Sequence, residues 1–177
     1  MRLERSMDLL LSAAQTWRVL LDSEYNLIYG KKKKLYTLRL VFSPEDFYHN
    51  AGFQHLDDIT FSHITSHPKT LDSVLSGTIT QEMIQKSQNY LSFVEPRLKA
   101  IVYLQNLLES DFRTYMFNAR KLPFYTEIQA EYLIVGASSD IVFLFTDADA
   151  DDGHYFPRSI FVQDIRDYTI NQTPIYL

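Results

Sequence analysis

The chain has 177 residues, of which 46% are hydrophobic, so it is long enough to form one domain with a sizeable core. Its formal net charge of −5 does not favour nucleic-acid binding overall, so a polyanionic partner would have to meet a local basic patch. The absence of cysteine excludes disulfides, thiolate metal sites and a cysteine nucleophile, and it fits a reducing cytoplasm.

The N-terminal segment 1–23 carries apolar residues at helical spacing, with Trp17 on the same stripe, and predicts an amphipathic helix. Charged residues such as Asp8 and Arg18 interrupt every apolar run in this segment. It therefore resembles neither a signal peptide nor a membrane span. We expect a cytoplasmic protein that makes no membrane contact.

Apolar residues alternate over residues 25–29 and again over 36–42, which predicts the two strands of a β-hairpin. Gly30 and the four lysines Lys31–Lys34 are expected to make the turn. Arg39 should lie on the face opposite Leu38 and Leu40. The lysines have two interpretations: they bind phosphate, or they form a solvated turn that blocks edge-to-edge aggregation.

Residues 43–52 have the signals of a short helix, with Ser43 as N-cap, Pro44 at the first helical position and Gly52 at the end. His49 is a candidate general base or acid, because imidazole titrates near neutral pH. The alternative is a histidine that is hydrogen-bonded at a helix end. His55 is a candidate second acid or base, or it faces solvent.

The middle of the chain, residues 70–110, is helical in character, and Pro96 is expected to start the main helix there. His63 and His67 have a spacing that binds zinc when both lie on a helix. Pro68 and the lack of a third ligand nearby argue against such a site. We expect neither a metal nor a cofactor.

The last third predicts strands over residues 128–135, 141–146 and 156–162, with a turn at 136–140 and edge strands at 115–117 and 175–177. The expected class is α+β, in a single domain covering residues 1–177. Its antiparallel sheet would combine the early hairpin with a C-terminal meander. The N-terminal helix (1–23) and a helical insertion (70–110) would pack against this sheet.

Two polar groups border the third C-terminal strand. The aspartate-rich turn at 147–153 lacks the glycine and glutamate of a calcium loop, so it is a loose cation site or a solvated acidic turn. Arg158 enters the strand from this turn, next to Ser159. An arginine there stabilises the charge of a phosphorane, or it forms an ion pair with the neighbouring aspartates.

Two segments resemble a known family. Residues 46–53 (DFYHNAGF) resemble a Phe-x-His-Leu-x-Gly segment, with Asn50 in place of the usual leucine, and residues 155–161 (YFPRSIF) resemble the strand at the end of that family's domain. The family is the phage-associated, PBECR4-type branch of the barnase, EndoU, colicin and RelE-like (BECR) nucleases. The resemblance implies a RelE- or barnase-like fold and metal-independent RNA cleavage through the 2′-hydroxyl. It matches His49 to the family histidine and Arg158 and Ser159 to its polar strand positions.

Together these features give the hypothesis of a small endoribonuclease. His49 would be the general base, Arg158 and Arg39 would hold the phosphate, Lys34 would add positive potential, and Tyr36 or Ser159 would donate a hydrogen bond. RNA would lie between the hairpin and the terminal strands, and a tyrosine would stack on a base. The alternative is a non-catalytic domain of a mobile element, or a degenerate nuclease fold, that binds a protein such as an inhibitor or antitoxin.

Overall fold

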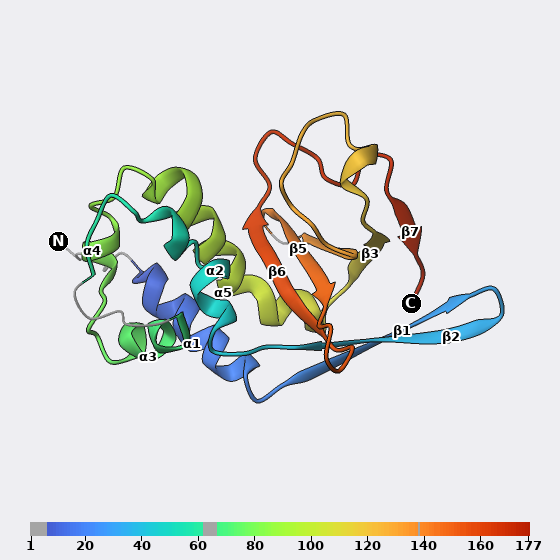
Figure 1. Ribbon diagram of the computed structural model, residues 1–177, viewed down its shortest axis with the longest axis horizontal. Helices are drawn as coiled ribbons and strands as arrows, with labels where there is room; N and C mark the ends of the chain where they lie inside the picture. Colours follow the sequence, from blue (N-terminus) through green and yellow to red (C-terminus); the bar gives the residue numbers. More distant parts are fainter. Residues whose placement is uncertain (1–6, 62–66, 138) are drawn as a thin grey trace.

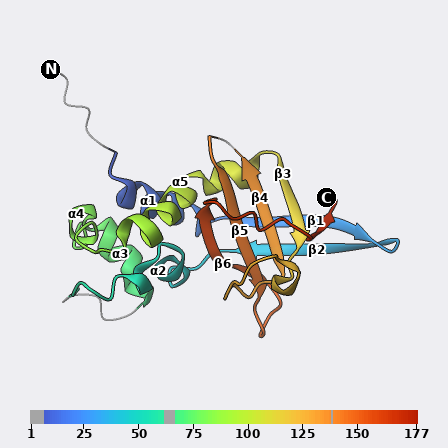
Figure 2. The same ribbon diagram turned by 90° about the horizontal axis from the view of Figure 1, so that it is seen from above.

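The structure, a computed structural model, describes residues 7–61, 67–137 and 139–177. Its helices lie together at one end of the molecule and its strands at the other (Figures 1 and 2). The helices are α1 (Leu9–Leu20), α2 (Asp46–Asn50), α3 (Thr70–Leu75), α4 (Gln81–Ile84) and α5 (Glu95–Glu109), with 3₁₀ turns η1 (Phe53–His55), η2 (His67–Lys69) and η4 (Ala119–Lys121) and a π-helical turn η3 (Tyr90–Val94). The strands are β1 (Glu24–Lys31), β2 (Lys34–Val41), β3 (Phe112–Met116), β4 (Tyr132–Ala137), β5 (Ile141–Ala148), β6 (Tyr155–Val162) and β7 (Thr173–Ile175).

The strands form one seven-stranded sheet in the order β1-β2-β6-β5-β4-β3-β7. This confirms the α+β class, but the expectation of a purely antiparallel sheet is wrong. β2 runs parallel to β6 and pairs with it only at Leu40 and Tyr155, while the other neighbours are antiparallel. Between β2 and β6 the chain passes through the helices and then through β3, β4 and β5, so the two parallel strands are joined by a long connection, as parallel pairing requires.

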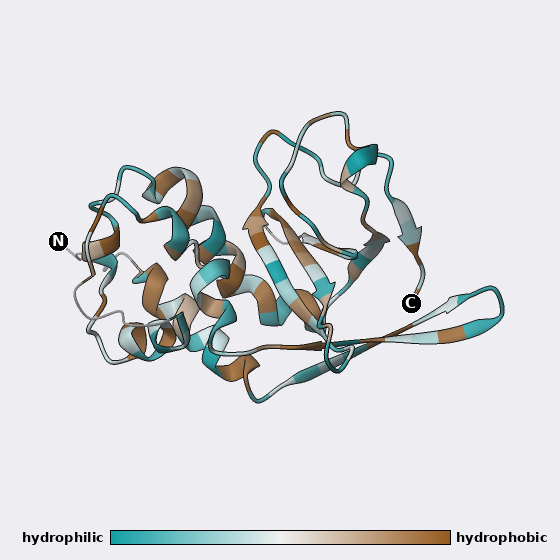
Figure 3. Cartoon of the chain, viewed as in Figure 1, coloured by the Kyte–Doolittle hydropathy of each residue, from teal (hydrophilic) through white to brown (hydrophobic). Residues whose placement is uncertain are grey.

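The predicted hairpin is present, and its turn is tighter than expected. Lys32 and Lys33 form the turn, with φ values of 50° and 63°. Two successive positive φ values are typical of the type I′ turn, whose twist matches that of the flanking strands. Gly30 was expected in the turn but pairs with Leu35 in the ladder. The hairpin projects from the body of the molecule and ends in a hydrophilic tip (Figures 1 and 3).

The sheet is covered on both faces. On one face, α5 packs against apolar residues of the central strands and α1 packs against α5, in one core that contains Trp17, Leu144 and Ile160. α1 begins at Leu9, where the Asp8 side chain caps it, so the described part of this helix is shorter than the predicted segment. On the other face, Phe143 and the residues Phe117, Leu122, Leu133, Phe145 and Tyr168 form a smaller aromatic cluster.

The C-terminal strands differ in detail from those predicted. β4 begins at Tyr132 rather than residue 128, and Gly136 lies inside this strand rather than in a turn. A Cβ at Gly136 would lie 2.6 Å from Cγ of Leu107, so glycine lets α5 pack close to the strand. β3 was expected at an edge but lies between β4 and β7. No helix in the described ranges is both long and apolar enough to cross a membrane.

Candidate active site

α2 holds His49 on the surface next to β6. Phe47 is fully buried, and His49, two residues further along the helix, is exposed. The Asn50 side chain lies inward and donates hydrogen bonds from Nδ2 to the carbonyl oxygens of Asp46 (2.8 Å) and Pro157 (2.9 Å). The second bond is buried and fixes α2 to β6. It therefore sets the position of His49 relative to the strand.

Gly52 brings the first turn of α5 close to α2. Its φ of +87° lies in the left-handed region, as expected for the residue that ends a helix. A Cβ at this position would lie 2.9 Å from the Phe93 carbonyl oxygen and 2.9 Å from Cδ of Arg97. Only glycine therefore allows both the backbone conformation and this approach.

β6 carries a β-bulge at Arg158. Thr146 pairs with Pro157 and Phe145 pairs with Ser159, so Arg158 has no partner on β5. A bulge leaves the extra residue outside the ladder and changes the direction of its side chain, and bulges are frequent beside active sites. Here Arg158 is exposed while Ser159 is buried.

Arg97, from the first turn of α5, reaches the edge of β6. Its Nη1 donates a hydrogen bond to Oγ of Ser159 (3.0 Å), and its guanidinium carbon lies 5.8 Å from the centre of the Phe161 ring. Burial lowers the pKa of Arg97 to about 10, so the side chain stays charged at neutral pH. None of the ion pairs within the described residues involves Arg97 or Arg158.

The surroundings of His49 are cationic. Partial burial lowers the pKa of His49, and the positive charges of His67, Arg158 and Arg97 lower it further. No carboxylate in the described part of the chain contributes to this shift. The imidazole is therefore mostly neutral at neutral pH, which is the state that a general base needs. We name this group of four side chains the histidine–arginine cluster.

His67 joins the cluster from η2. Its ring stacks on Tyr48 with ring centres 3.9 Å apart, and it lies 5.0 Å from the ring centre of His49. His63, the other half of the spacing considered for zinc, lies outside the described residues. His67 therefore lies beside a histidine of α2, His49.

His55, in η1, also lies near Arg97. Its ring stacks on Phe93 with centres 4.8 Å apart. Partial burial lowers the pKa of His55, and the charge of Arg97 adds to this effect, while Asp57 opposes it. Both His55 and His49 therefore lie within the electrostatic reach of one guanidinium.

The hairpin residues expected at the site lie elsewhere. Arg39 is placed between two carboxylates, Glu24 (3.7 Å) and Asp152 (3.9 Å), beside the start of β6. Tyr36 is half-exposed and stacks on Tyr29 with ring centres 5.5 Å apart. Lys34 is exposed beside the turn, at the end of the hairpin far from α2 (Figure 1). The structure thus brings His49 near Arg158, and leaves these three residues along the hairpin.

The aspartate-rich turn is organised by its own hydrogen bonds. Asp149, Asp152 and His154 each offer one ligand atom within 4.8 Å of the others. Asp149 accepts a hydrogen bond from the Asp151 backbone, and Asp152 accepts from the backbone and contacts the ring of His154. This turn provides the carboxylate that pairs with Arg39, so the ion pair that we considered for Arg158 is made by Arg39 instead.

One protein-family model covers nearly the whole chain. A family model described as phage-Barnase-EndoU-ColicinE5/D-RelE like nuclease4 matches residues 9–177. The chain belongs to this family. Neither a curated protein nor a solved structure matches it. The resemblance inferred from residues 46–53 and 155–161 is therefore confirmed, and the chain is a BECR-type nuclease domain.

Two residues of the histidine–arginine cluster were missed in the sequence. Arg97 and His67 were absent from the predicted site, because their segments carry helical and proline signals but nothing that indicates proximity to residue 49. Arg97 follows Pro96 at a helix start, where an arginine is unremarkable in sequence. The close approach at Gly52 and the hydrogen bond to Ser159 bring Arg97 to the cluster.

Proposed function

We propose that this BECR-type nuclease domain is a metal-independent endoribonuclease whose reaction takes place at the histidine–arginine cluster. The observation that carries the proposal is a lowered pKa at His49 beside two guanidinium groups, with no carboxylate contributing to the shift. A neutral imidazole accepts a proton, and guanidinium groups bind a phosphodiester and stabilise the charge that develops on it. RNA supplies the internal 2′-hydroxyl nucleophile that this arrangement needs.

In the proposed reaction, His49 removes the proton of the 2′-hydroxyl. The 2′-oxygen then attacks phosphorus, the bond to the 5′-oxygen breaks, and the leaving oxygen takes a proton from His67. The products are a 2′,3′-cyclic phosphate and a free 5′-hydroxyl. Arg158 and Arg97 hold the phosphate oxygens through the transition state. Ser159 acts through Arg97, because it accepts a hydrogen bond from that side chain.

The test is RNA cleavage by the purified protein in EDTA. We expect a 2′,3′-cyclic phosphate at the new end, and a loss of roughly 10²–10⁴-fold in rate for His49→Ala, the range for removal of a general base. Arg158→Ala should also lower the rate. Arg120→Ala is a suitable control, because this exposed arginine lies in η4, outside the cluster. Full activity of His49→Ala would contradict the mechanism.

A further inference from the structure

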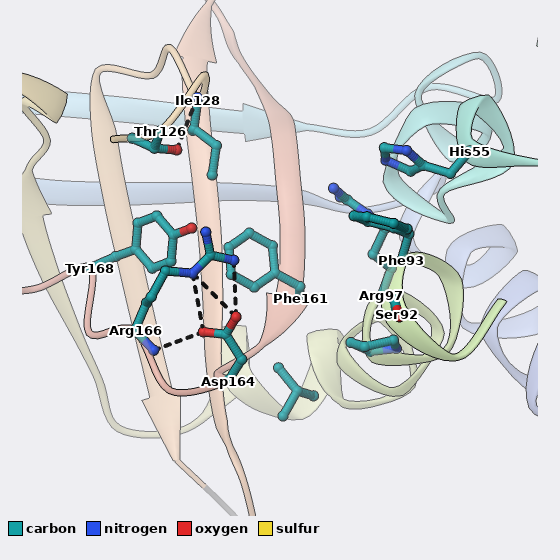
Figure 4. Close-up of a pocket in the computed structure, with 12 residues that line it drawn as sticks. His55, Ser92, Phe93, Arg97, Thr126, Ile128, Phe161, Asp164, Arg166 and Tyr168 are labelled. Carbon is teal, nitrogen blue, oxygen red and sulfur yellow. Dashed lines mark hydrogen bonds and ion pairs between the residues drawn. The ribbon is translucent and has the colours of Figure 1, made fainter. Parts of the chain in front are cut away.

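A pocket of about 220 Å³ lies next to the histidine–arginine cluster. It is bounded on one side by η1 and the first turn of α5, and on the other by the end of β6 and the segment that follows it (Figure 4). Arg97 lines this pocket and also acts electrostatically on His49. Arg97 therefore belongs both to the lining of the pocket and to the histidine–arginine cluster.

Flat aromatic groups form much of the pocket. On one side His55 stacks on the exposed ring of Phe93, and on the other Phe161 packs edge-to-face on the buried ring of Tyr168, with ring centres 5.4 Å apart. Its volume is smaller than the roughly 300–1,000 Å³ of pockets that hold drug-sized ligands, so it fits a single ring system. Bases of single-stranded RNA are commonly held against such aromatic and guanidinium surfaces.

Arg166 provides a polar edge in this pocket. Its Nε and Nη2 donate to Oδ2 of Asp164 at 3.2 and 2.9 Å, and its backbone N–H donates to Oδ1. Its guanidinium carbon lies 5.7 Å from the centre of the Tyr168 ring. Asp164 thus occupies one edge of the guanidinium and fixes its plane. The neighbouring edge, formed by Nη1 and the second hydrogen of Nη2, has no acceptor among the described residues.

Two parallel N–H donors discriminate between bases. Guanine offers two adjacent acceptors, O6 and N7, on one edge, and arginine binds them with two hydrogen bonds. Adenine places an amino donor next to N7, so one of the two arginine donors would face another donor. Uracil and cytosine have no N7 and cannot offer this pair.

We propose that this pocket is a guanine subsite, in which Arg166 reads the O6/N7 edge and the exposed ring of Phe93 stacks on the base. The phosphate attached to the same nucleoside would then lie at Arg97 and the cluster. The consequence for RNA, a preference for cleavage beside guanosine, rests on the proposed nuclease function. Binding of the base does not depend on it.

The first experiment measures binding and needs no catalysis. Guanosine 3′-monophosphate, adenosine 3′-monophosphate and inorganic phosphate are titrated into the wild-type protein, by calorimetry or NMR. We expect guanosine 3′-monophosphate to bind at least ten-fold more tightly than the adenosine nucleotide, because a bidentate pair is lost with adenine. Equal affinity for the two nucleotides would overturn the proposal.

Two variants separate recognition from charge. Arg166→Lys keeps the positive charge but cannot form the paired hydrogen bonds, so we expect it to lose the guanine preference while binding phosphate as before. Arg166→Ala should lose the preference as well. Arg120→Ala, an exposed arginine outside this pocket, should keep it. A preference that survives in both Arg166 variants would show that Arg166 does not read the base.

A second experiment separates the subsite from the nuclease activity. Short RNAs containing one guanosine, or one adenosine at the same position, are incubated with the protein in EDTA. Selective nucleotide binding without cleavage of either RNA would support the subsite and contradict the proposed function. Cleavage of both RNAs at equal rates, together with equal nucleotide binding, would support the nuclease and overturn the subsite.

Discussion

Replacing Gly52 by alanine tests the close approach on which the candidate site depends. Its φ of +87° costs an alanine about 1–2 kcal/mol. The new Cβ would also lie 2.9 Å from the Phe93 carbonyl oxygen, and overpacking of this kind costs about 1–3 kcal/mol. We therefore expect Gly52→Ala to lower the free energy of unfolding by about 2–5 kcal/mol, a large part of the roughly 5–15 kcal/mol typical of a domain.

Gly77→Ala is the matched control. Gly77 has a φ of +79°, but a Cβ there would meet nothing within 4 Å, so only the backbone cost remains. The loss of unfolded-chain entropy on replacing glycine by alanine is common to both variants and cancels in the comparison. In urea unfolding with a slope of about 2 kcal/mol per M, we expect the midpoint to fall by about 1–2.5 M for Gly52→Ala and by about 0.5–1 M for Gly77→Ala. Equal shifts would refute the close packing of α5 against residue 52.

Three other predictions concern separate elements. The proposed base must be unprotonated, so on the acidic side of the pH profile RNA cleavage should decline as the pH falls through the pKa of His49, below the ordinary 6.5; Arg158→Gln should raise the His49 midpoint in an NMR titration, and an unchanged midpoint would contradict the coupling. Replacing Lys32 and Lys33 together by Asn and Gly should raise stability by about 0.5–1 kcal/mol in thermal unfolding, because both positions already have positive φ; a loss would argue against the type I′ turn. Asn50→Ala should cost about 1–3 kcal/mol in urea unfolding, because it leaves a buried carbonyl of β6 without its donor, and a neutral result would mean that this bond does not anchor α2.

Signals local to a few residues predicted much of the fold. The hairpin, the short helix that carries His49 and the strands ending in β6 were predicted from alternation, proline and glycine. The start of α2 was predicted two residues too early, because the N-cap is Glu45 rather than Ser43. Oγ of Ser43 donates to the Asp46 carboxylate (2.7 Å), and the Ser43 carbonyl accepts from Nε1 of Trp17 (2.9 Å), so Ser43 connects α2 to α1 instead of capping it. The role of Ser43 therefore depends on its contact with Trp17, which is distant in sequence, and not only on its neighbours in the chain.

The composition of the site was less predictable, because it depends on register and packing between distant segments. Pro157 is a sequence signal for a bulge or an edge in this strand, but that Arg158 is the residue left outside the ladder follows from how β5 and β6 align. Arg39 has the alternation expected of an outward-facing strand residue, but whether it meets a phosphate or a carboxylate depends on where the aspartate-rich turn folds back. From the sequence alone, Arg39 and Arg158 were equally plausible phosphate ligands.

The buried bond from Asn50 to Pro157 joins residues 107 positions apart. During synthesis, α2 leaves the ribosome long before the strand against which it must dock. Until β6 has emerged, His49 has neither Arg158 nor the Ser159 hydroxyl that holds Arg97. An unfinished chain therefore carries only fragments of the cluster, and any activity that depends on all of them begins only once the C-terminal strands have folded.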